Sequence, residues 1–126
     1  MHTVKSDPHF LFVLMTGKVD QLSLHEAQKE LMLHPDYAHK NTLWMFDEAC
    51  ECDFSNFVMF EMLNRIKVFF PIESSKQKAA LVGVAPMHYS FLKLFCDEAE
   101  HEGLPFKVQP FHSYQEAEAW LLGHEV

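Results

Sequence analysis

Glycine is scarce in this chain of 126 residues, which has only four, all isolated from one another. A phosphate-binding loop needs clustered glycines, and the nucleophile elbow of serine hydrolases needs Gly-x-Ser-x-Gly; neither pattern occurs. A Cys–His pair that uses Cys52 or Cys96 stays open, because a sequence does not show which side chains meet in space. We therefore expect a binding domain and not an enzyme.

Basic residues are also few, with 10 Lys and Arg against 18 Asp and Glu and a formal net charge of −8. The positive residues are scattered along the chain. Nucleic-acid binding requires a basic face that neutralises phosphates, so this composition excludes nucleic acid as the expected partner. The same charge disfavours strong attraction to anionic lipid.

Long apolar runs are missing. The longest unbroken one, Phe10–Met15, is far too short for a membrane span, and the N-terminal residues do not resemble a signal peptide. The three cysteines are an odd number without the spacing of a disulfide scaffold. We expect a cytoplasmic protein with reduced thiols, at most peripheral to the inner face of a membrane.

The pair Cys50-x-Cys52 lies in an acidic loop at residues 48–53. Cys-x-Cys is not the usual spacing of structural zinc sites, no second cysteine pair follows, and no histidine is close in sequence. We therefore predict a solvated loop and no metal or other cofactor. Asp47 precedes the loop at the end of a predicted strand, where it serves as a ligand-binding residue at the rim of the sheet or as an ordinary turn carboxylate.

What the chain does contain is a regular alternation of apolar strands and amphipathic helices. Strands are predicted at residues 3–5, 10–16, 43–47, 78–85 and 106–111, and helices at 23–33, 54–70, 86–102 and 114–122. The order ββαβαβαβα predicts an α/β domain over residues 1–126 with a mixed, mostly parallel five-stranded sheet. The first two strands are close enough for an antiparallel hairpin.

Several residues indicate where the predicted helices begin and end. Ser23 and Ser113 each precede a glutamate by three residues, which is the capping-box pattern. Pro86 suits the first position of the third helix, and Gly103 suits the position after its end. The apolar residues predicted for the core face of that helix are Met87, Phe91, Leu92, Phe95, Cys96 and Ala99.

The predicted helix at residues 54–70 is more apolar than one buried face requires. At ~100° per residue, one half of the wheel suits docking on a sheet. That half holds Phe54, Val58, Met59, Met62, Leu63, Ile66, Phe69 and Phe70. Phe57, Phe60 and Val68 fall on the other half, among polar residues. A second apolar stripe needs a neighbouring element, a subunit, a ligand or a membrane to cover it.

This helix supplies the predicted binding site. If it is mobile, it covers a pocket lined by Phe54, Val58, Met62, Ile66 and Phe69, which suits a hydrophobic small molecule or lipid. Phe57, Phe60 and Val68 then contact a membrane surface or a partner. The alternative is that a fixed core or a dimer partner covers all of them.

Local patterns along the chain resemble a known family. They are LMTGKVD, LMLHPDY, LWMFD, KAALVG and VQPFHSYQEAEAWLL, in that order. Together they resemble the STAS domain of anti-sigma-factor antagonists and the uncharacterised bacterial SpoIIAA-like branch. The resemblance implies a SpoIIAA-like fold and, as the alternative function, a protein–protein regulatory module that forms a homodimer. The architecture is also similar to the lipid-binding core of CRAL-TRIO domains, where a mobile helix covers an apolar pocket.

The family resemblance also implies a switch position. In the antagonists, a phosphorylatable serine begins the helix after the strand that ends in Asp, in an Asp-Ser-Ser context. Ser55, in Asp53-Phe54-Ser55, is the residue of this chain that matches this place. The Asp-Ser-Ser-Gly pattern itself is absent, which favours Ser55 as an ordinary first-turn residue. We therefore predict a non-catalytic domain that recognises an apolar ligand or a membrane.

Overall fold

The computed structural model describes residues 1–37, 39–52, 60–64, 77–104 and 107–123. The strands are β1 (His2–Ser6), β2 (Phe10–Met15), β3 (Lys18–Val19), β4 (Asn41–Phe46), β5 (Glu51–Cys52), β6 (Lys78–Gly83) and β7 (Lys107–Phe111). The helices are α1 (Gln21–Leu33), α3 (Pro86–His101) and α4 (Tyr114–Leu121). Residues 60–64 are also helical and are called helix 60–64 below.

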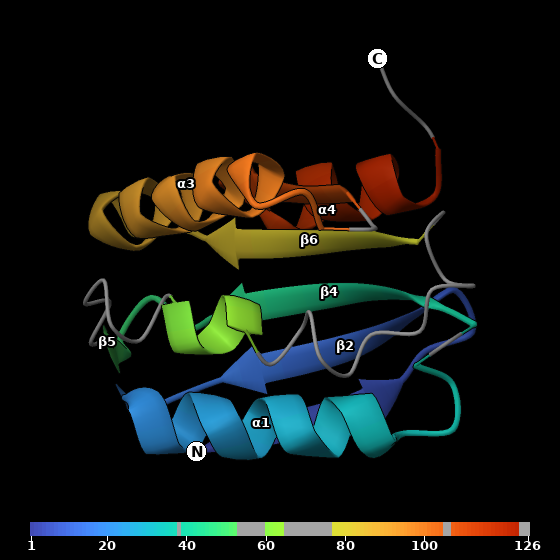
Figure 1. Ribbon diagram of the computed structural model, residues 1–126, viewed down its shortest axis with the longest axis horizontal. Helices are drawn as coiled ribbons and strands as arrows, with labels where there is room; N and C mark the ends of the chain where they lie inside the picture. The colour runs from blue at the N-terminus through green and yellow to red at the C-terminus, as the bar shows by residue number, and fades with distance from the viewer. Residues whose placement is uncertain (38, 53–59, 65–76, 105–106, 124–126) are drawn as a thin grey trace.

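Five strands form one sheet in the order β1-β2-β4-β6-β7 (Figure 1). β1 runs antiparallel to β2, and the remaining neighbours are parallel. The register aligns Val13 with Trp44, and Trp44 with Leu81. The predicted mixed, mostly parallel sheet is confirmed. Each of these strands was predicted within about two residues of its observed ends, the usual error of such boundaries.

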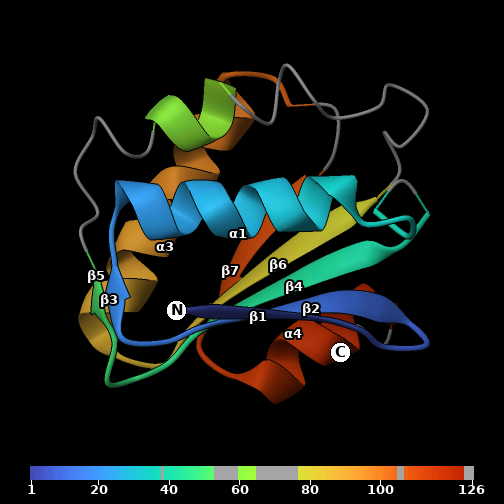
Figure 2. The same ribbon diagram turned by 90° about the horizontal axis from the view of Figure 1, so that it is seen from below.

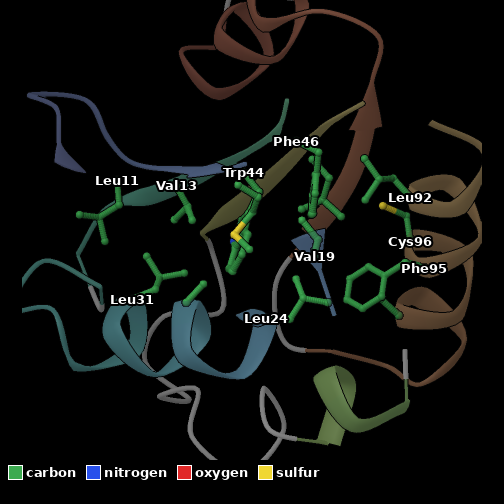
Figure 3. Close-up of a cluster of buried hydrophobic side chains, with 14 of the residues drawn as sticks. Leu11, Val13, Val19, Leu24, Leu31, Trp44, Phe46, Leu92, Phe95 and Cys96 are labelled. Atoms are coloured by element: carbon green, nitrogen blue, oxygen red, sulfur yellow. The ribbon is translucent and has the colours of Figure 1, made fainter. Parts of the chain in front are cut away.

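Helices cover both faces of this sheet. α1, α3 and helix 60–64 lie on one face, and α4 lies on the other (Figure 2). Alternate residues of β2 therefore enter different cores, with Leu11 and Val13 in the larger one and Phe10 in the smaller. Figure 3 shows how side chains from the sheet, from α1 and from α3 fill the larger core. Because both of its faces are covered, β2 is continuously apolar, as the sequence indicated.

Helix α1 begins earlier than predicted, so the capping box expected for Ser23 and Glu26 is wrong. Asp20 is the N-cap: its Oδ1 accepts a hydrogen bond from Ser23 N at 3.0 Å. The Ser23 hydroxyl in turn accepts from Asp20 N at 2.8 Å. Asp and Ser both favour the N-cap position, and here the upstream Asp20 takes it, with Ser23 completing the reciprocal pair of hydrogen bonds. For α4, Ser113 is the N-cap as predicted, and accepts from Glu116 N at 3.3 Å.

A second, two-stranded sheet was not predicted. β3 pairs in parallel with β5, and Glu51 N donates to Gly17 O at 2.8 Å. Both strands follow directly from the carboxyl ends of central strands, β3 from β2 and β5 from β4. Part of the loop predicted to be solvated is therefore a strand, and Cys50 at its start is buried. A strand of two residues is too short to produce a detectable sequence pattern.

Candidate functional site

Helix 60–64 is seated on the larger core by one side of its surface. Leu63 is 1% exposed and belongs to that core. Met62 packs against the same cluster, and its carbonyl oxygen accepts a hydrogen bond from Gln28 Nε2 of α1 at 3.5 Å. Phe60 points outward with 48% of its surface exposed. The helix therefore presents an aromatic side chain to solvent above an apolar anchor.

Most of the predicted site falls outside the described residues. This holds for Phe54, Ser55, Phe57, Val58, Ile66, Val68 and Phe69. The pocket beneath helix 54–70, its outer stripe and the switch position Ser55 remain predictions.

Helix α3 exposes apolar side chains along one stripe. Met87 is 71% exposed and Leu94 is 56% exposed, with the half-buried Phe91 between them on the same side of the helix. The prediction that Met87 faces the core is wrong. The buried face instead contains His88 together with Leu92, Phe95, Cys96 and Ala99. The buried face thus begins one residue later than predicted, and His88 points inward at its start.

His88 meets two cysteines at the carboxyl end of the sheet. Cys50 Sγ and Cys52 Sγ lie 3.1 Å apart. One ligand atom of each cysteine and a ring nitrogen of His88 all lie within 4.8 Å of one another. Cys50 and His88 are buried, and Cys52 is half-buried. We call these three residues the Cys–His cluster.

The backbone around the two cysteines explains why their thiols meet. Residues two apart in an extended chain point to the same side, so Cys50, the residue before β5, and Cys52 within it place their side chains on one side. Cys50 N donates to Asp47 O at 3.0 Å, which closes a turn after β4. Asp47 N donates to Met15 O at 2.9 Å, so this turn is tied to the end of β2. Asp47 thus lies at the rim of the sheet, as its position after a strand indicated.

His88 reaches the cluster because Gly83 ends β6. A Cβ atom at residue 83 would lie 2.8 Å from Tyr89 N and 3.0 Å from His88 C. Glycine therefore lets the first turn of α3 approach the end of the strand. The next side chain, Tyr89, stacks on His112 with 3.6 Å between ring centroids. The cluster was missed from the sequence because its third member comes from a distant helix whose register this glycine sets.

The thiols of the cluster are held in their protonated form. Burial raises the pKa of Cys50, and the nearby Asp47 carboxylate raises it further. Burial also raises the pKa of Cys52, and its neighbour Cys50 adds to the effect. Burial raises the pKa of Cys96, outside the cluster, to about 12. Thiols in this state are weak nucleophiles near neutral pH, so the geometry offers no activated cysteine.

A separate cavity of about 570 Å³ lies beside the edge strand β7. Its lining comes from α3, β7, α4 and the link between α3 and β7, and comprises Cys96, Ala99, Glu100, Leu104, Lys107, Val108, Gln109 and Trp120. The mixture of charged and apolar side chains differs from the apolar lining expected for a fatty-acyl ligand.

No helix in the described part of the chain has both the length and the apolar content that crossing a bilayer requires.

Comparisons with known proteins identify the fold. No protein-family model matches the chain, and no curated protein matches it. Among solved structures, it is similar to an uncharacterized protein of the DUF3478 family with a SpoIIAA-like fold, from Shewanella loihica PV-4. The identity is 11% over 96% of this chain and 92% of that chain, with a TM-score of 0.54. This similarity confirms the SpoIIAA-like fold that the sequence patterns indicated.

Proposed function

We propose that this SpoIIAA-like chain is a non-catalytic binding domain that recognises a lipid-like apolar ligand or a membrane surface through helix 60–64. The observation that supports this proposal is the half-exposed Phe60 above the buried Leu63. A phenyl ring in this position is available for contact, while the residue three places later anchors the helix. The net charge of −8 favours an uncharged or zwitterionic lipid over an anionic one.

The energies limit how strong this association is. Burying the remaining exposed half of Phe60 contributes about 1 kcal/mol, given about 1.5–3 kcal/mol for a whole side chain. Entry of a ligand beneath the helix requires Leu63 to leave the core, at a cost of about 2–3 kcal/mol. The open form is then about a few per cent of the population or less. We therefore expect reversible binding and not permanent anchoring.

Co-sedimentation with phosphatidylcholine vesicles tests the proposal. Phe60→Asp should reduce the bound fraction, because a carboxylate would replace the contacting ring. Leu22→Asp is the matched control: it makes the same change in charge at an exposed leucine in the first turn of α1. Absence of binding by the wild type, or equal binding by Phe60→Asp, would refute the membrane role. Equal losses in both variants would indicate a general effect of charge.

A second candidate is a STAS-type interaction module that forms a homodimer, and the exposed stripe of α3 favours it. Met87, Phe91 and Leu94 provide a continuous apolar strip of the kind that subunit interfaces bury. Light scattering across a concentration series distinguishes the two candidates. A dimer that Leu94→Asp dissociates, and that Leu33→Asp at the end of α1 does not, would support this alternative. A monomer at every concentration would exclude the homodimer.

A further inference from the structure

We propose that Cys50, Cys52 and His88 bind a Zn²⁺ ion at the carboxyl end of the sheet. Two thiol sulfurs and one imidazole nitrogen are the ligand types that zinc takes in proteins. The three atoms come from two separate elements, β5 with its preceding residue and the first turn of α3, and they converge within 4.8 Å. This site is independent of the proposed role of helix 60–64.

The observed spacing is close to that of a zinc site. With Zn–S near 2.3 Å and Zn–N near 2.0–2.1 Å, tetrahedral ligand atoms lie about 3.3–3.8 Å apart. The sulfurs, at 3.1 Å, would separate slightly, and any longer distance within the 4.8 Å limit would close by about 1 Å. Shifts of this size need only small changes in side-chain torsions. The backbone of the turn and of α3 is already in place.

The chemistry of the donors selects the metal. Thiolate ligands favour zinc and monovalent copper, whereas magnesium and calcium prefer sites made of oxygen atoms. Both cysteines are protonated thiols in the free protein, so zinc binding must release their protons. The positive end of the α3 dipole lies beside the cluster and favours the thiolates that result.

Three protein ligands leave one coordination position open. Cys52 is half-buried, so solvent or an external donor reaches this side of the cluster. Zinc sites with three protein ligands keep a water molecule or a substrate in the fourth position. The carboxyl ends of parallel strands are also where α/β sheets bind ligands. A bound zinc would therefore connect β5 to α3 and leave one position accessible.

Zinc titration of the reduced full chain tests this proposal, with a chromophoric chelator as competitor. We expect one ion per chain and release of about two protons. Cys50→Ser, Cys52→Ser and His88→Asn should each weaken zinc affinity by more than about 100-fold, since even residues that support metal ligands account for about 10–100-fold. The matched controls are Cys96→Ser, at a buried cysteine outside the cluster, and His112→Asn, at the histidine stacked on Tyr89. Both controls should keep wild-type affinity.

Two measurements on the wild type decide the question even if a variant fails to fold. Cobalt(II) should give the intense visible bands and the sulfur charge-transfer band of a tetrahedral thiolate site. Zinc, but not magnesium, should slow alkylation of Cys52. Absence of zinc uptake by the reduced protein would overturn the proposal. Undiminished uptake in the three cluster variants would overturn it too.

Discussion

Replacement of Gly83 by alanine tests how closely α3 approaches the sheet. The added Cβ would lie 2.8 Å from Tyr89 N, 3.0 Å from His88 C and 3.0 Å from Leu92 Cδ1. Two of these three atoms belong to the helix backbone, so the first turn of α3 has to move. Overpacking of this kind costs about 1–3 kcal/mol, and the reduced freedom of the unfolded chain offsets about 0.4–1 kcal/mol of that. We expect a net loss of about 1–2 kcal/mol in the free energy of unfolding.

Urea denaturation and thermal unfolding monitored by circular dichroism measure this loss, and a chain of this size should show a decrease in Tm of about 4–8 °C. Gly103→Ala is the control. Its φ of 68° is unfavourable for alanine, yet a Cβ there meets no atom within 4 Å. It should lower stability by about 1 kcal/mol through backbone strain alone and leave zinc affinity unchanged. Gly83→Ala should lower both, because it displaces His88. Unchanged stability and zinc affinity in Gly83→Ala would refute this account.

Further substitutions test the packing and the helix caps. Leu63→Ala should lower the free energy of unfolding by about 2–4 kcal/mol, whereas Phe60→Ala should change it by less than about 1 kcal/mol; equal effects in urea denaturation would contradict the docking of helix 60–64. Ser113→Ala should cost about 1 kcal/mol through loss of the α4 cap, and Ser90→Ala, at an exposed position of α3, should have little effect on Tm. The hydrogen bond from Ser23 N holds the pKa of Asp20 below its ordinary value of 3.8. The ionised Asp20 carboxylate therefore contributes its full stabilisation above pH 3.8, and this contribution is lost as the pH falls through the lowered pKa of the folded protein. Asp20→Ala should flatten the acid limb of a profile of stability against pH.

The order and type of the long elements could be predicted because their signals are local. The run Phe10–Met15 is apolar at every position, which indicates a strand covered on both faces, and the structure has helices on both sides of it. Ser113 and Gly103 mark helix ends by the hydrogen bonds and the backbone conformation that they supply. Each of these features depends on a few neighbouring residues, so one sequence is enough to detect it.

The features that were missed depend on contacts between distant parts of the chain. β3 and β5 are too short to be recognised separately, and each is ordered by the other. The inward position of His88, in place of Met87, follows from the exact register of α3 at the end of β6. The Cys50-x-Cys52 spacing is evident in the sequence, but the sequence does not show that His88 lies beside it. Of the predicted apolar site, the structure describes Phe60 and Met62.

The small β3–β5 sheet joins two surfaces that are far apart in the sequence. β3 leads directly into Asp20, the residue that starts α1, and β5 carries Cys52. The backbone pairing of Val19 with Cys52 therefore connects the residue before the α1 cap to the cysteines. α1 in turn holds helix 60–64 through Gln28. Strand pairing, α1 and one hydrogen bond thus place the thiols at the rim of the sheet and the exposed ring of Phe60 on one connected series of elements.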